Sequence, residues 1–116
     1  MKPGHRVQRF EKEVRELASL WLISGVGEPL PGIPSVSRVV VSADLKLAKI
    51  YVQLIGDQIK VSSAGEENVE ALLEILERKA FLLQSDLAKK LKARFTPKVK
   101  FFYDDTLDHV LKVDKI

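Results

Sequence analysis

Hydrophobic residues recur every three or four positions near the start of the chain, in the segment HRVQRFEKEVRELASLWLI. This spacing places them along one face of an α-helix. We expect the helix to end before SGVGEPLPGIPS, because the three Gly and three Pro of that segment disfavour both helix and strand. The residues of the apolar face are Val7, Phe10, Val14, Leu17, Ala18 and Trp21.

The segment VSRVVVSADLKLAKIYVQLIG predicts two β-strands joined by a tight turn. Val39 and Val41 share one side of the first strand, and apolar residues fill alternate positions from 48 to 54 in the second. Residues 42–44, Ser-Ala-Asp, are typical of a turn. The opposite side of the second strand is more polar, so we expect one face of the sheet to contact water. Its residues are Lys49, Tyr51 and Gln53.

A second helical pattern runs through residues 69–91, which corresponds to about six turns. Because this is longer than most helices of globular proteins, we expect either a bend or two consecutive helices. The change should fall between Arg78 and Asp86. Ser85 is a candidate break point, because its hydroxyl can compete for backbone hydrogen bonds.

The last part of the chain predicts a third strand and a short helix. Pro97 ends the long helical region, and residues 98–103 alternate between polar and apolar character. The segment DDTLDHVLKV predicts a C-terminal helix, with Asp105 as its N-cap and Asp108 in its first turn. The order of elements indicates an α+β domain with helices packed on a three-stranded sheet.

The composition indicates one globular domain over residues 1–116, in which 46% of the residues are hydrophobic. Cys is absent, which fits a reducing compartment. The charged N-terminus does not resemble a signal peptide, and no apolar run approaches the ~20 residues that span a bilayer. We therefore expect a cytoplasmic monomer that does not enter a membrane.

Charge is sorted into blocks along the chain, although the net charge is only +3. Residues 2–15 carry five basic and two acidic side chains. Residues 66–77 carry five Glu and no basic residue, whereas residues 78–100 carry eight basic residues and one Asp. Such sorting favours a binding face for a polyanion over a uniformly solvated surface.

The basic run AKKLKARFTPKVKFF, residues 88–102, has two interpretations. On a helix, Lys89, Lys90 and Lys92 would project away from the leucine face, where they could contact phosphates. The same charges would also suit a solvated helix surface. A second basic strip could be added by Lys2, Arg6 and Arg9, or these charges could simply keep the first helix soluble.

Catalytic and metal sites are poorly supported. The segment DDTLDH at 104–109 gathers three carboxylates and His109, but helix-terminus electrostatics explains Asp105 and Asp108. No Cys nucleophile exists, and SGVGEPLPG lacks the flanking strand and helix of a phosphate-binding loop. We expect no catalytic residue, metal or cofactor. Tyr51 and Phe102 could stack on bases if the open face of the sheet were used, or could simply be half-buried strand residues.

Three segments together resemble the ribosome-binding factor A family. They are Arg6-Val7, the strand pair with its Ser-x-Asp-Leu turn, and LAKKLKARFTPKVKFFYDDTLDHVLKV. The resemblance covers nearly the whole chain and implies a KH-like domain of the second type, with the order helix-strand-strand-helix-helix-strand. The family places Ala-x-Gly at a kink between its central helices, but this chain has Lys79-Ala80-Phe81. We therefore expect the kink to be displaced toward Gln84 and Ser85, or the helices to be nearly continuous.

The resemblance implies an assembly factor that binds the immature 30S subunit and its 16S ribosomal RNA. It would assist late maturation and RNA end processing without catalysis. Two alternatives remain open, namely a protein-interaction module that docks a ribosomal protein and a general KH-type binder of single-stranded RNA. The candidate RNA-binding residues are Arg6, Arg9, Arg78, Lys79, Lys89, Lys90, Lys92 and Arg94.

Overall fold

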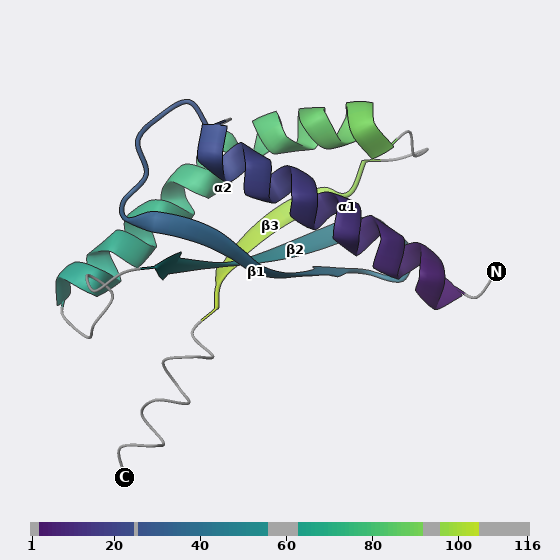
Figure 1. Cartoon of the computed structure of the whole chain (residues 1–116), viewed down its shortest axis with the longest axis horizontal. Helices are drawn as coiled ribbons and strands as arrows, with labels where there is room; N and C mark the ends of the chain where they lie inside the picture. The colour runs from purple at the N-terminus through teal and green to yellow at the C-terminus, as the bar shows by residue number, and fades with distance from the viewer. Residues whose placement is uncertain (1–2, 25, 56–62, 92–95, 105–116) are drawn as a thin grey trace, which may run out of the picture.

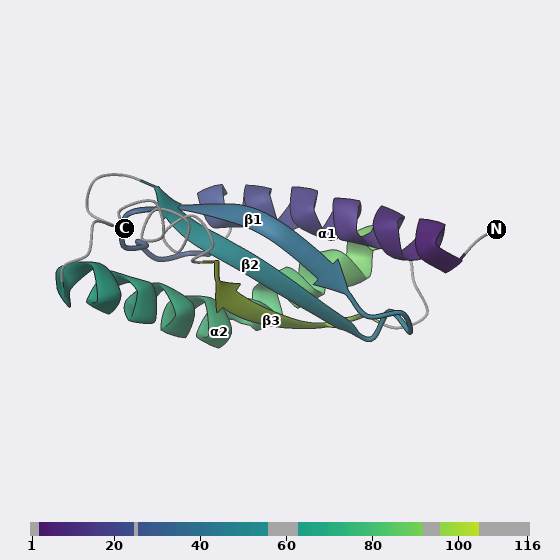
Figure 2. The same ribbon diagram turned by 90° about the horizontal axis from the view of Figure 1, so that it is seen from below.

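Two helices lie on one face of a three-stranded β-sheet (Figure 1). The computed structural model describes residues 3–24, 26–55, 63–91 and 96–104. Figure 2 shows the opposite face of the sheet, which neither helix covers. This arrangement confirms the predicted α+β class. The elements are α1 (Pro3–Ser24), β1 (Ile33–Val41), β2 (Leu47–Ile55), α2 (Ser63–Leu91) and β3 (Lys98–Tyr103).

The apolar face predicted for α1 packs against the sheet and against α2. Val14, Ala18 and Trp21 are buried, while the other three residues of that face are partly buried against the same core. Helix periodicity alone therefore identified the packed side of α1 correctly.

The sheet is mixed, with β2 in its centre and the order β1-β2-β3. β1 and β2 are antiparallel, with Val41 opposite Ala48, and the register shifts between Val36 and Arg38. β2 and β3 are parallel, from Leu47 opposite Lys98 to Val52 opposite Tyr103. A parallel neighbour requires a crossover, and α2 provides it.

The predicted turn between β1 and β2 is confirmed, and the Ser42 side chain organises it. Its Oγ donates to Oδ1 of Asp44 at 2.6 Å and accepts from the backbone N–H of Leu47 at 3.0 Å. Leu45 has a φ of 61°, a left-handed conformation in which side chains other than Gly, Asn and Asp are uncommon. This strained residue is held by the hydrogen bond from its N–H to the carbonyl of Ser42, at 2.9 Å.

α2 is one continuous helix whose axis bends near its middle (Figure 1). The expected bend is therefore present, and the alternative of two consecutive helices is wrong. Phe81, at the position where the resemblance predicts glycine, is helical like its neighbours. Ser85 is exposed and does not interrupt the helix. The buried leucines on both sides of this region keep one face toward the core, so a gentle curve suffices.

Two polar side chains of α2 satisfy backbone groups of β3. Oε1 of Gln84 accepts from the N–H of Val99 at 3.0 Å, and Oε1 of Glu77 accepts from the N–H of Phe101 at 3.1 Å. β3 is an edge strand, and such contacts reduce the number of unpaired groups that it presents.

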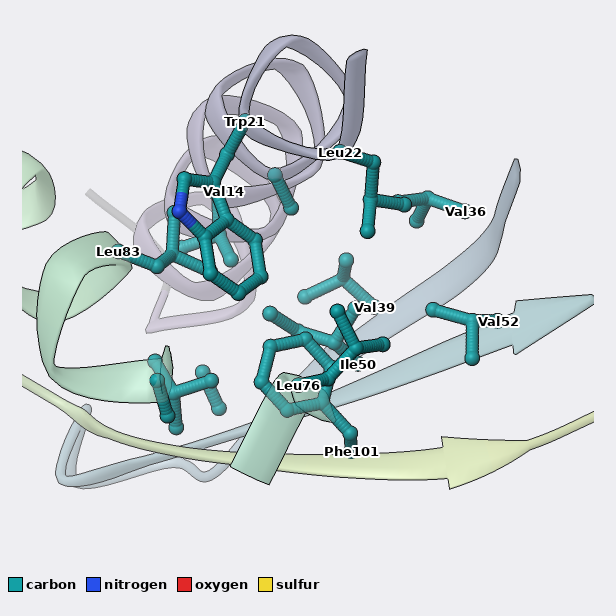
Figure 3. Packing of buried hydrophobic residues seen from close by; sticks show 14 of the residues in the cluster. Val14, Trp21, Leu22, Val36, Val39, Ile50, Val52, Leu76, Leu83 and Phe101 are labelled. Carbon is teal, nitrogen blue, oxygen red and sulfur yellow. The ribbon is translucent and has the colours of Figure 1, made fainter. Parts of the chain in front are cut away.

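The core lies between the helices and the covered face of the sheet (Figure 3). Trp21 of α1 stacks on Phe101 of β3, with ring centroids 5.6 Å apart and an angle of 23° between the rings. The leucines of α2 and the alternate residues of β2 complete this core, and the largest fully buried side chains among them are Ile50, Val52, Leu72, Leu76, Leu83 and Leu87. The expected C-terminal helix, with Asp105 and Asp108, lies outside the described residues.

Candidate nucleic-acid interface

The end of α2 presents two lysines to solvent. Lys89 and Lys90 lie in its last turn and are exposed, while Leu87 beside them is buried. Positive charge near the C-terminus of a helix interacts favourably with the helix dipole, whether or not it also binds a ligand. However, among the described residues no carboxylate forms an ion pair with either lysine, so both ammonium groups are accessible to a ligand.

Arg6 and Arg9 lie at the same end of the molecule. They are exposed in the first turns of α1, and Figures 1 and 2 both place the start of α1 and the last turns of α2 at this end. Because the two helices run in opposite directions along the sheet, residues from distant parts of the sequence contribute to one basic region.

Arg78 and Lys79 have a carboxylate beside them. Nη1 of Arg78 lies 2.8 Å from Oε1 of Glu28, and Nη2 lies 3.4 Å from Oε2. Nζ of Lys79 is 4.0 Å from the same carboxylate. Glu28 belongs to the connection between α1 and β1, so these pairs tie that connection to α2. The charges of Arg78 and Lys79 are thus partly compensated, unlike those of Lys89 and Lys90.

Two further lysines lie at this same end of the molecule, where the parallel strands β2 and β3 begin (Figures 1 and 2). The N–H of Lys98 donates to the carbonyl of Lys46 at 2.8 Å, which brings their backbones together. Both residues are exposed. The sequence contains both charges but carries no signal that they are neighbours, because the register between distant strands is not encoded locally. Lys92 and Arg94 lie outside the described residues.

One carboxylate, Asp44, shares the turn with Lys46. The hydroxyl of Ser42 is the main cause that lowers the pKa of Asp44 below its ordinary value, followed by the backbone N–H of Lys46. Asp44 is therefore ionised at neutral pH and reduces the positive potential at this corner. We name the basic end from its described basic residues, which are Arg6, Arg9, Lys46, Lys89, Lys90 and Lys98.

The other half of α2 is acidic. Glu67, Glu70 and Glu74 are exposed on the part of α2 that lies far from the basic end (Figure 1). The charge sorting seen along the sequence is therefore also a separation in space. Acidic residues near the start of a helix and basic residues near its end both stabilise the helix through its dipole.

Metal ligands and membrane-spanning helices can be considered for the described residues only. In the described parts of the chain, no three His, Cys, Asp or Glu side chains come close enough to hold a metal ion. Residues 105–109 of the DDTLDH segment lie beyond those parts. Neither α1 nor α2 combines the length and the apolar content that a membrane-spanning helix needs.

Proteins with related sequences share one description. The sequence profile of the family described as Ribosome-binding factor A matches residues 6–116. Ribosome-binding factor A of Bdellovibrio bacteriovorus is 38% identical over 116 residues, which cover 100% of this chain and 81% of the relative. That of Nitrosomonas eutropha is 32% identical over 116 residues, covering 99% of this chain and 92% of the relative.

Solved structures show the same fold. A Thermotoga maritima protein solved by NMR in solution superposes with a TM-score of 0.67 at 25% identity, over 88% of this chain and 90% of that one. The crystal structure of ribosome-binding factor A from Thermus thermophilus superposes with a TM-score of 0.56 at 18% identity, over 84% of this chain and 94% of that one. Because the family profile spans almost the entire sequence and the Bdellovibrio relative matches throughout, the chain belongs to the ribosome-binding factor A family.

Proposed function

We propose that this protein binds the immature 30S subunit through its 16S ribosomal RNA and assists late maturation and end processing of that RNA without catalysis. Family membership supports the ribosomal partner. Coordinates of the Thermus thermophilus relative have been fitted into a cryo-EM map of its complex with the 30S subunit. The protein would act as a monomer in the cytoplasm, as one RNA-binding domain.

The observation that carries the proposal is the basic end. Lys89 and Lys90 are exposed without an ion-pair partner among the described residues, and Arg6 and Arg9 lie at the same end. Each phosphate that a cation neutralises releases counterions, which gives affinity without requiring a base-specific pocket. The mechanism would be positional: phosphate contacts fix the protein on folded RNA and favour one RNA arrangement over another.

Among the candidate residues, the ion pairs with Glu28 suggest a ranking. Lys89 and Lys90 have no ion-pair partner within residues 3–24, 26–55, 63–91 and 96–104, so a phosphate contact there requires no described ion pair to be broken. Arg78 and Lys79 would have to leave Glu28 or share it, so each gains less from a phosphate contact. Lys92 and Arg94 remain candidates on their sequence position alone.

The first experiment is co-sedimentation with purified small subunits, large subunits and whole ribosomes across a salt series. The parent should prefer small subunits. If four phosphates are contacted, binding should weaken on the order of 100-fold between 50 and 200 mM salt. The variant Lys89→Gln/Lys90→Gln should bind more weakly, and the slope of its salt dependence should be shallower by about 2.

The matched control is Arg78→Gln/Lys79→Gln, which removes two cations from the same helix. Because Glu28 already compensates these two charges, we expect a smaller change in slope. If Lys89→Gln/Lys90→Gln sediments like the parent at every salt concentration, the basic end is not the RNA contact. If the parent shows no preference for small subunits, the proposed partner is wrong for this chain.

A second candidate function is docking of a basic ribosomal protein on the acidic half of α2. The exposed Glu67, Glu70 and Glu74 favour it, since their spacing of three and four residues places them on one side of α2. Binding to subunits that depends on these residues, and not on Lys89 and Lys90, would support this alternative.

A further inference from the structure

The uncovered face of the sheet carries three stacked side chains that cross all three strands. The guanidinium carbon of Arg38 lies 4.3 Å from the ring centroid of Tyr51. Tyr51 stacks on Phe102, with centroids 5.4 Å apart and an angle of 27° between the rings. The register places Arg38 opposite Tyr51 and Tyr51 opposite Phe102. The stack therefore runs from β1 through β2 and ends at Phe102.

Phe102 is the accessible end of this stack. It is 38% exposed, and it belongs to an edge strand beyond which the structure describes no other strand. Tyr51 is half-buried between Arg38 on one side and Phe102 on the other. Cross-strand aromatic pairs stabilise sheets, and this role explains the Tyr51–Phe102 contact. It does not explain why the last ring of the row leaves its outer side accessible.

Two lysines flank the stack on the same face. Lys49 on β2 and Lys100 on β3 are opposite one another, two residues before Tyr51 and Phe102 respectively. Two residues along a strand correspond to about 7 Å, so both ammonium groups are within reach of a ligand seated on Phe102. Asp104 directly follows β3 and accepts a hydrogen bond from the hydroxyl of Ser37.

An aromatic face beside cations fits one kind of polymer better than others. An unpaired nucleotide offers a flat base for stacking and a phosphate for a cation within the same residue. A guanidinium on the far side of Tyr51 adds to the row a cation–π contact of the kind found in such sites. A folded RNA helix would keep its bases stacked on one another, so the occupant must be single-stranded.

We propose that the uncovered face of the sheet is a second RNA contact, at which an unpaired base stacks on the outer side of Phe102. The adjoining phosphates lie against Lys49 and Lys100. This surface adjoins the basic end at Lys98, but it does not require phosphate contacts by Lys89 or Lys90. It gives the protein a means to hold a single-stranded segment while the basic end contacts folded RNA.

The test measures binding of a fluorescent single-stranded oligouridylate of about ten nucleotides, a typical site size, by anisotropy. The variant Phe102→Ala should bind about 5- to 100-fold more weakly than the parent, the range that loss of one base–aromatic stack produces. The matched control is Phe81→Ala, the same change at a phenylalanine that is 61% exposed on α2. This control should bind like the parent.

Two further measurements separate stacking from other contacts. An oligomer of the same length without bases should bind the parent and Phe102→Ala equally, because the lost interaction needs the base. The variant Phe102→Leu keeps apolar bulk without an aromatic face and should bind nearly as weakly as Phe102→Ala. Lys49→Gln/Lys100→Gln should make the salt slope shallower by about 1.4, the value for two phosphates of a single strand.

Several outcomes would overturn the proposal. These are equal binding by Phe102→Ala and Phe81→Ala, equal loss of binding to the oligomers with and without bases, and full binding by Phe102→Leu. The last result would indicate an apolar surface of the kind a protein partner uses. Thermal unfolding of each variant confirms that it folds. The variant Lys89→Gln/Lys90→Gln should still bind the oligomer with bases more tightly than the oligomer without bases. A negative result for stacking on Phe102 can therefore be distinguished from a negative result for phosphate binding at the basic end.

Discussion

One hydroxyl group, that of Ser42, holds together the turn between β1 and β2. It donates to Asp44 and accepts from the N–H groups of Lys46 and Leu47. The carboxylate of Asp44 accepts in turn from the N–H of Lys46 at 3.1 Å. Side chains that satisfy nearby backbone groups in this way allow Leu45 to occupy its left-handed conformation.

The variant Ser42→Ala should raise the pKa of Asp44 toward its ordinary value, because the Ser42 hydroxyl is the largest cause of the lowering. It should also destabilise the protein by about 1 kcal/mol, the usual contribution of a hydrogen bond of this type. NMR titration of the Asp44 carboxyl carbon and chemical unfolding measure the two effects. Ser85→Ala, at an exposed position on α2, is the control and should leave the pKa of Asp44 unchanged.

The direction of the pH effect follows from the sign of the shift. Since the folded protein holds the pKa of Asp44 below its ordinary value of about 3.8, ionised Asp44 favours folding. This contribution is fully present above that value and is lost as the pH falls through the folded pKa. The difference in stability between the parent and Ser42→Ala should therefore shrink below about pH 4. A constant difference down to lower pH would contradict the role given to the hydroxyl.

The sequence left open whether the region of α2 forms one bent helix or two consecutive helices, and the structure shows one. The Ala-x-Gly pattern of the family implies a kink, but Phe81 stands at the glycine position and α2 passes through it. Phe81 is largely exposed, so its substitution should remove little hydrophobic stabilisation.

Substitution at Phe81 tests this continuity directly. Phe81→Gly should be less stable than Phe81→Ala by about 1 kcal/mol, the difference in helix propensity between the two residues. Hydrogen exchange should become faster in the middle of α2 in the glycine variant, because local opening costs less there. If the two variants are equally stable and exchange alike, the backbone around Phe81 is not a regular helix in solution.

Elements with strong local patterns were predictable, and contacts between distant elements were not. The periodicity of α1 and the alternation in β2 identified the buried residues Val14, Trp21 and Ile50 correctly. The parallel register of β2 with β3 depends on how α2 crosses the sheet, so no local pattern reports it. For the same reason no local pattern predicts the ion pair of Arg78 with Glu28, because β1, β2 and the first half of α2 separate the two residues in the sequence.

The whole molecule has an acidic and a basic end, and the distance between them determines how they interact. Along α2, Glu70 and Glu74 are about 25 Å from Lys89 and Lys90, given the rise of a helix. Screening acts over about 8 Å at physiological ionic strength and about 30 Å at 0.01 M salt. The acidic half therefore opposes RNA binding only when salt is low.

The variant Glu70→Gln/Glu74→Gln should bind small subunits like the parent at physiological salt and more tightly at low salt. Co-sedimentation at both salt concentrations measures this, with Lys89→Gln/Lys90→Gln as the comparison that should bind weakly at both. Weaker binding by Glu70→Gln/Glu74→Gln at physiological salt would instead mean that the acidic half contacts the partner. That result would favour docking of a basic protein.

The parallel pairing of β2 with β3 also determines how early during translation the proposed RNA-binding surfaces can form. α1, β1 and β2 precede α2 along the chain, whereas Phe102 is made only after nearly half of the sequence has followed Tyr51. Closing so long a loop is entropically costly and slow. A partly synthesised chain has the aromatic ring of Tyr51 but neither Phe102 nor Lys98. The surfaces proposed to hold RNA are therefore completed only after β3 has been synthesised, later than α1, β1 and β2.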